Sequence, residues 1–298
     1  MMDIDRIAIS KWGPVAGFTL ARILPRPFAY WLADRLTAHL SRNENSPMVQ
    51  AIRANQAVVQ GLQEDDPALD KVVWNVLRHA GRCQVDFFKG VGGGHRAVLR
   101  STVMDETFTR GIEAGRESGR GLVVVGAHMS NFDLFLLSIR SRGMDPQVLS
   151  YPNPRGSYAV QNRIRTRFGV NLTPTGLKAL RQAFRTLSDG GMVAPGVDPP
   201  GLGGEPLTFF GRTTVLPVGH ARLAVRTNSP VLAGVVQSSG WGKYTAVGSP
   251  LFEPRLNGDE HQDTIELAQR VLGWFEDRIR ENPEEWLMFY PVWNNGDD

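Results

Sequence analysis

The stretch LVVVGAHMSNFDLFLL, residues 122–137, decides the fold. Its first half is a β-branched run that ends in small residues, and its second half is apolar with helical spacing. This pattern predicts a buried strand that leads into a helix. In α/β folds, chemistry usually lies at such junctions, and this one contains His128 and Asp133, an imidazole and a carboxylate five positions apart.

These two groups are suited to general-base catalysis, in which the imidazole takes a proton and the carboxylate fixes the ring tautomer. The chain has no Gly-x-Ser-x-Gly elbow, so the sequence favours direct attack by a substrate hydroxyl. Because each helical residue turns by about 100°, His128 and Asp133 can meet only if His128 lies at or before the N-cap and Asp133 in the first turn. The alternative is an ordinary helix start, where acidic residues are favoured.

Further strands and helices alternate on both sides of this junction, which predicts an α/β fold with a central, mostly parallel sheet flanked by helices. We expect a helical region over residues 1–95 and an α/β catalytic region over 96–298, separated by a glycine-rich break at 90–94. The expected strands are 122–127, 147–151, 192–197, 231–236 and, at the sheet edge, 244–247. The expected helices are 46–62, 66–89, 98–118, 157–168, 176–188, 217–228 and 259–281.

Composition narrows the classes of partner. The chain has 298 residues, with 33 Lys and Arg against 30 Asp and Glu, and this near balance argues against a nucleic-acid partner. The glycine run at 90–94 is not followed by Lys-Ser or Lys-Thr, so it is not a phosphate-binding loop. Cys83 is the single cysteine, which excludes an internal disulfide and a cysteine-based zinc site.

The segment 12–40 is apolar and aromatic but interrupted by charges. Its longest uncharged run, 12–21, is far shorter than the ~20 residues that span a bilayer, and the N-terminus has no pattern of a secretory signal. Two interpretations remain open: a helix that lies in the membrane interface, or amphipathic helices packed on the domain.

The sequence resembles the bacterial lipid A biosynthesis (lauroyl/myristoyl) acyltransferase family, which includes phosphatidylinositol mannoside acyltransferases and belongs to the lysophospholipid acyltransferase group. The resemblance covers most of the chain and depends on five motifs in order: His128-x-x-x-x-Asp133, NRIRTRFG at 162–169, DPPG at 198–201, FFGR at 209–212 and PEEWLMF at 283–289.

The resemblance implies a peripheral or monotopic enzyme on the cytoplasmic face of the inner membrane. Such an enzyme would move a fatty acyl chain from acyl-CoA or acyl carrier protein, as co-substrate, to a hydroxyl of a lipid or glycolipid, without a cofactor or metal. It also implies that His128 is the general base and Asp133 its orienting partner. A non-catalytic lipid-binding protein on the same fold is the alternative.

The remaining motifs imply substrate-binding residues. Arg165, with Arg163 and Arg167 as helpers, would contact an anionic group, and Asp198 falls in the acidic loop of the family. The side chains that would line the acyl or headgroup path are those of the FFGR motif, namely Phe209, Phe210, Gly211 and Arg212. A solvated helix face for the arginines and core packing for the aromatic residues are the alternative interpretations.

Overall fold

The predicted strand is β2, Leu122–Gly126, at the centre of a seven-stranded sheet in the computed structural model, which describes residues 23–154, 156–198 and 204–293. The strand order is β1-β9-β8-β2-β5-β3-β4, and every neighbouring pair is parallel except β8 and β9. The other strands are β1 Thr102–Met104, β3 Gln147–Ser150, β4 Leu172–Pro174, β5 Met192–Ala194, β8 Val231–Gly240 and β9 Lys243–Gly248, with a separate hairpin of β6 Glu205–Phe209 and β7 Arg212–Leu216.

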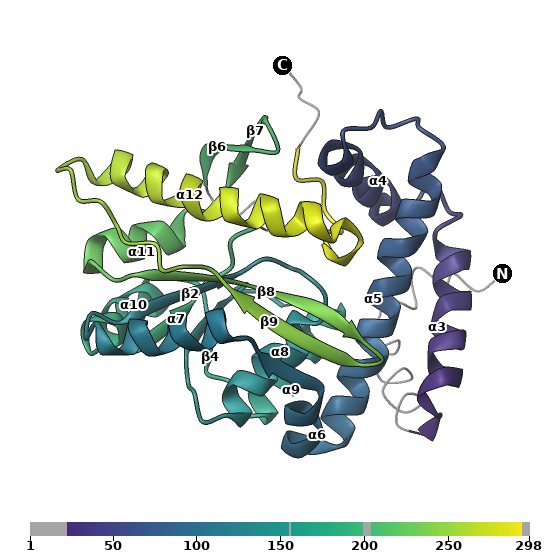
Figure 1. Ribbon diagram of the computed structural model, residues 1–298, viewed down its shortest axis with the longest axis horizontal. Coiled ribbons are helices and arrows are strands. Elements are labelled where there is room, and N and C mark those ends of the chain that lie inside the picture. The colour runs from purple at the N-terminus through teal and green to yellow at the C-terminus, as the bar shows by residue number, and fades with distance from the viewer. Residues whose placement is uncertain (1–22, 155, 199–203, 294–298) are drawn as a thin grey trace.

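The alternation of side chains along β2 divides the core into two layers, because successive strand residues point to opposite faces. Val123 and Val125 pack in one layer with α10, α11 and α12. Leu122 packs in the other with α7 and α8. Helices therefore cover both faces of the sheet, as predicted (Figure 1).

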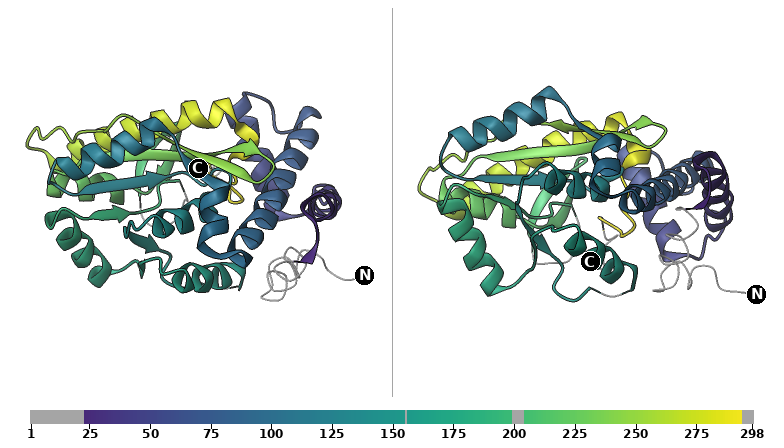
Figure 2. Two further views of the ribbon diagram at one scale, coloured as in Figure 1. Left: turned by 60° about the horizontal axis from the view of Figure 1, so that its bottom comes forward. Right: turned by 90° about the horizontal axis from the view of Figure 1, so that it is seen from below.

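The helices agree in most places with the predicted ranges. A helix begins at Arg26, and the long α5 lies beside it at one side of the molecule, whereas α12, in yellow, lies along the sheet (Figure 2). Their bounds are α3 Arg26–Leu40, α4 Pro47–Gln60, α5 Ala68–Gly92, α6 Gly94–Ser101, α7 Glu106–Glu117, α8 Phe132–Ser141, α9 Gly156–Arg167, α10 Leu177–Ser188, α11 Gly219–Thr227 and α12 Glu260–Glu281, with a short 3-10 turn, η1, at Pro283–Glu285.

Two local predictions are wrong. The expected helix 98–118 is split by β1, which pairs with β9, so β9 is not an edge strand. Asp105 then starts α7 by accepting a hydrogen bond from the Phe108 N–H, as an N-cap does. The glycine-rich stretch is not a flexible break either, because α5 continues to Gly92. Gly90 packs closely on α8, since a Cβ there would lie 2.5 Å from Leu134 Cδ1 and the leucine side chain would have to move.

A buried carboxylate attaches α3 to the rest of the molecule. Asp86 of α5 accepts hydrogen bonds from Tyr30 of α3 at 2.5 Å, from Tyr244 of β9 at 2.7 Å and from Arg26 at 3.0 Å. α3 therefore lies beside α5, at the end of the sheet where β8 turns into β9 (Figure 1). Among the described residues, no helix is long and apolar enough to cross a bilayer, and the run 12–21 lies outside them.

Candidate active site

The site contains one basic group and one acidic group, and each follows one of two neighbouring parallel strands. β2 pairs with β5, and a bridge between Gly126 and Gly196 extends this pairing. His128 follows β2 and Asp198 follows β5, so both lie at the carboxyl edge of the sheet, where α/β folds place their ligand sites.

Asp198 holds His128 at two points. One carboxylate oxygen lies 2.6 Å from His128 Nδ1, and the other accepts the His128 backbone N–H at 2.8 Å. The Asp198 side chain is 2% exposed and that of His128 is 34% exposed. With Asp198 ionised, Nδ1 carries the proton, so Nε2 presents its lone pair as a base.

Electrostatics strengthen this pair. Burial opposes the charging of His128, but Asp198 outweighs it and the pKa of His128 is raised. Burial likewise opposes ionisation of Asp198, but His128 and the N–H donors lower the pKa of Asp198. The pair thus favours a carboxylate that supports an imidazolium, which is the charge distribution that general-base catalysis creates.

Asp133 is not the hydrogen-bond partner of His128, so that expectation is corrected. His128 does precede the N-cap, Asn131, and Asp133 does lie in the first turn of α8. However, Asp133 accepts from Arg165 Nε at 2.7 Å and also from Nη2, while Arg165 Nη1 donates to Asn162 at 2.9 Å. The first turn of α8 directs Asp133 towards α9, whereas Nδ1 of His128 faces the end of β5.

Of the predicted arginines, only Arg165 is buried. Its guanidinium stacks over Tyr158 at 5.4 Å, and Asp133 raises its pKa against the effect of burial. Arg163 and Arg167 are exposed. Arg165 therefore does not share an exposed face of α9 with the other two. Contact of Arg165 with an anionic substrate group therefore stays a prediction.

A third segment, residues 285–287 at and after η1, contacts both Asp198 and the turn that carries His128. Trp286 Nε1 donates to Asp198 at 3.1 Å, so Asp198 receives hydrogen bonds from three groups. The Leu287 N–H donates to His128 O at 2.8 Å, and the Ser130 N–H donates to Glu285 O at 2.7 Å. The backbone of the turn that carries His128 is thus held by this segment as if by a neighbouring strand.

The FFGR motif forms the tip of the β6–β7 hairpin. Phe210 and Gly211 both have positive φ, 52° and 73°, as a two-residue turn of this hand requires. Phe209 is buried against Trp286 and Trp293, with ring centroids 5.9 and 5.6 Å away. The structure therefore places Phe209 in core packing, and contact of the motif with an acyl chain stays a prediction.

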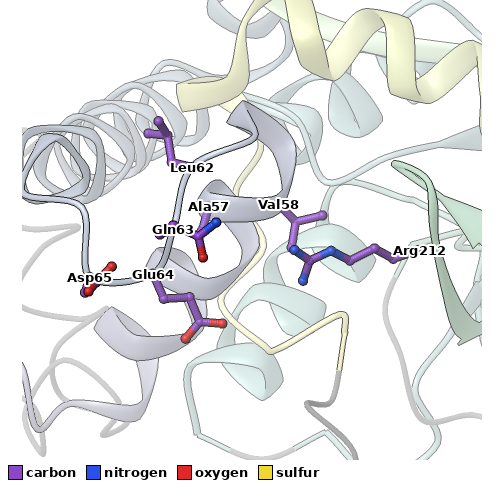
Figure 3. A pocket seen from close by; sticks show the side chains of 7 residues that line it. All are labelled: Ala57, Val58, Leu62, Gln63, Glu64, Asp65 and Arg212. Carbon is purple, nitrogen blue, oxygen red and sulfur yellow. The ribbon is translucent and has the colours of Figure 1, made fainter.

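Arg212, next in the motif, lines a cavity of about 340 Å³ between β7 and the loop after α4 (Figure 3). Its other lining residues are Ala57, Val58, Leu62, Gln63, Glu64 and Asp65. His128 and Asp198 do not line this cavity. Within the described ranges, no group of three or more His, Cys, Asp or Glu side chains is placed to hold a metal ion.

Sequence reasoning missed the pairing of His128 with Asp198 and the contact from Trp286. The sequence contains a signal for the pairing of His128 with Asp198, because each residue follows a predicted strand and neighbouring parallel strands end at the same edge of a sheet. For Trp286 the signal was weaker, since a tryptophan in an aromatic segment indicates core packing as readily as a donor to a carboxylate.

Comparison with known proteins assigns the chain to a family. The family model of the bacterial lipid A biosynthesis acyltransferases matches residues 2–295. Phosphatidylinositol mannoside acyltransferases of Mycobacterium tuberculosis, from strains H37Rv and CDC 1551, are each 25% identical to the chain over 303 residues. Each of these alignments covers 95% of this chain and 88% of the relative.

Proposed function

Because the chain belongs to the bacterial lipid A biosynthesis acyltransferase family and is an acyltransferase, we propose that His128 and Asp198 catalyse direct acyl transfer from a thioester to a lipid or glycolipid hydroxyl. The observation that carries this proposal is the 2.6 Å contact between Asp198 and His128 Nδ1, which leaves Nε2 as the base. The mycobacterial relatives make a phosphatidylinositol mannoside the first acceptor to test.

In the proposed step, His128 Nε2 takes the proton of the acceptor hydroxyl while its oxygen attacks the thioester carbonyl carbon. The tetrahedral intermediate then collapses, the carbon–sulfur bond breaks, and the thiolate receives the proton from Nε2. Asp198 stabilises the imidazolium between these two transfers. The start of α8, just after His128, favours negative charge and supports the oxyanion.

The donor in this proposal is acyl-CoA or acyl carrier protein, and no covalent acyl-enzyme forms. In support, the only serine of the junction, Ser130, is buried, with 1% of its surface exposed, so an acyl thioester does not reach its hydroxyl. Incubation with radiolabelled palmitoyl-CoA, with and without a phosphatidylinositol mannoside, followed by acid quenching, tests both points. We expect label in a new lipid and none on the protein; stable label on the protein in the absence of acceptor contradicts direct transfer.

The two aspartates of the site give the sharpest test of the mechanism. Asp198→Asn removes the charge that fixes the imidazole, so we expect kcat to fall by about 10²- to 10⁴-fold. The acid limb of the kcat/KM profile moves to lower pH, because the pKa of His128 is no longer raised. Asp133→Asn is the matched control.

Asp133→Asn leaves Arg165 buried without its counter-charge, and we expect the free energy of unfolding to fall by about 3–5 kcal/mol. The acid limb of the surviving activity moves less than in Asp198→Asn, since Asp198 raises the pKa of His128 more than Asp133 does. If instead Asp133→Asn moves the limb and Asp198→Asn does not, Asp133 is the orienting partner and the proposal is wrong. Full activity of His128→Ala excludes base catalysis by His128.

We also propose that the enzyme works at a membrane surface, the cytoplasmic face of the inner membrane, with α3 at the interface. Phe28 and Trp31 are each 51% exposed and their rings stack with centroids 5.4 Å apart, and Ile23, three residues before the start of α3, is 73% exposed. Arg35 lies 5.5 Å over the Trp31 ring. Exposed aromatic residues with arginine at their border suit the headgroup region of a bilayer.

A further inference from the structure

The turn that carries His128 contains a serine in an unusual conformation. Ser130 has φ of 48°, in the left-handed region that favours glycine, and is 1% exposed. Ser130 lies between β2 and α8, two residues after His128, so it belongs to the turn from which the His128 side chain projects. A strained residue persists only where its surroundings hold it in place.

The segment 285–287 holds the backbone of this turn, and α5 holds its side chains. His79 Nε2 lies 2.9 Å from Ser130 Oγ. One helical turn later, the Cys83 carbonyl accepts a hydrogen bond from Asn131 Nδ2 at 2.8 Å. Ser130 and the N-cap of α8 are therefore both held by α5, on the side of the turn that Asp198 does not contact.

We propose that His79 is a positioning residue for acyl transfer, which keeps His128 against Asp198 by holding the Ser130 hydroxyl and with it the left-handed turn. The inference rests on the proposed role of His128 as the base. Burial, with Arg82 nearby, lowers the pKa of His79 to about 4. His79 is therefore neutral near pH 7, and holds the hydroxyl without adding a second positive charge beside His128.

The test uses three kinds of variant: one that removes the hydrogen bond of His79, one that replaces His79 with another polar residue, and one that makes the hydrogen bond unnecessary. His79→Phe keeps the ring but removes the hydrogen bond, and we expect kcat to fall about 10- to 100-fold because the base is misplaced, with KM for both substrates nearly unchanged. His79→Gln keeps a polar group near the position of Nε2 and recovers most of this loss.

Ser130→Gly introduced into His79→Phe is the suppressor. Glycine adopts positive φ without a hydroxyl to hold it. We therefore expect the double variant to recover at least half of the decrease in log kcat that His79→Phe causes. A purely structural role for His79 predicts no such rescue. If His79→Phe does not fold, the single variants decide: Ser130→Ala must lose more kcat than Ser130→Gly, and equal losses overturn the proposal.

A second readout does not depend on turnover. The hydrogen bond from His128 Nδ1 to Asp198 is expected to give a far-downfield proton resonance, which is assigned by its loss in His128→Ala. It should weaken or shift in His79→Phe and persist in His79→Gln. An unchanged resonance in folded His79→Phe overturns the inference, whereas active His128→Ala overturns the proposed function instead.

The chain offers a matched control in a second histidine–serine pair. His95 Nδ1 lies 2.8 Å from Ser141 Oγ, at the other end of α8. His95→Phe removes the same kind of hydrogen bond at the opposite end of α8 from the turn of Ser130, and we expect kcat to change less than about 2-fold, as for a surface site. An equal loss of kcat in His95→Phe and His79→Phe would show a general loss of α8 and overturn the specific role of His79.

Discussion

At the scale of single residues, two buried carboxyl groups, those of Asp198 and Glu285, differ in how readily they ionise. Asp198 receives three hydrogen bonds from N–H donors and its pKa is lowered, so it is a stable anion beside His128. Glu285, near it in the structure, accepts the Ser238 N–H at 3.0 Å, but burial raises the pKa of Glu285 to about 7. One carboxylate is thus suited to permanent charge and the other titrates close to neutrality.

This raised pKa predicts a pH-dependent stability. Above its unfolded pKa of about 4.3, Glu285 is charged in the unfolded chain but still binds a proton in the folded one, so it lowers stability as pH rises from about 4.3 to 7. Glu285→Gln removes this effect. We expect the variant to be more stable than the wild type at pH 8, by up to about 3 kcal/mol, and to gain nothing at pH 4.

Urea unfolding at the two pH values measures the effect. Glu113→Gln, at an exposed glutamate of α7, is the control, and its unfolding free energy should change little at either pH. A Glu285→Gln variant that is less stable than the wild type at pH 8 would mean that the charged form is favoured in the folded protein.

At the scale of elements, α5 connects the surface helix α3 to the catalytic turn. Asp86 bonds Tyr30 of α3, and His79, two turns earlier in α5, bonds Ser130 of the turn. α3 keeps Tyr30 on its packed side and Phe28 and Trp31 on its open side. The interpretation in which an N-terminal helix packs on the domain is therefore confirmed for α3, and contact of its exposed face with a bilayer stays a proposal.

The open face of α3 predicts a measurable contribution to vesicle binding. Trp31→Glu removes a large apolar side chain and adds a negative charge, so we expect binding to phosphatidylcholine and phosphatidylglycerol vesicles to weaken about 10-fold or more. Leu177→Glu, on another highly exposed apolar residue in α10, is the matched control. Sedimentation with vesicles measures both, and equal losses would show that α3 has no special part.

At the scale of the whole molecule, the larger core layer includes residues far apart in the chain. Val123 and Val125 of β2 and Phe275 of α12 belong to it, and so do Trp286 and Trp293 near the end of the described chain. Trp293 Nε1 also donates to Phe209 O at 3.2 Å. The last described segment is therefore part of the main core and of the site at once.

Trp293→Ala should destabilise the entire fold. The side chain is buried against Phe209 and Phe210, and we expect the free energy of unfolding to fall by about 3–5 kcal/mol, as for other buried large-to-small changes. Trp241→Ala, at the exposed tip of the β8–β9 hairpin, should cost less than about 1 kcal/mol. Chemical denaturation distinguishes the two, and similar losses would contradict the assignment of Trp293 to the core.

Much of the fold could be predicted from local patterns. The run that ends at Gly126 and the helical spacing after Asn131 depend on neighbours in sequence, so β2 and α8 were correct. β1 was missed because three residues between two helices carry almost no periodic signal. The pairing of His128 with Asp198 depends on β5 lying beside β2, and the contact of His79 with Ser130 depends on where α5 packs; neither distance is encoded by spacing along the chain.

The hydrogen bond from Trp286 to Asp198 has a consequence for how the protein is made. A ribosome completes His128 and Asp198 well before it reaches Trp286, which follows Asp198 by 88 positions. During that interval the nascent chain has the base and its carboxylate but neither the tryptophan donor nor the backbone bonds that fix the turn. We therefore expect translation-arrested chains that stop before residue 285 to leave acyl thioesters intact, so that acyl transfer begins only after the segment that closes the site has been synthesised.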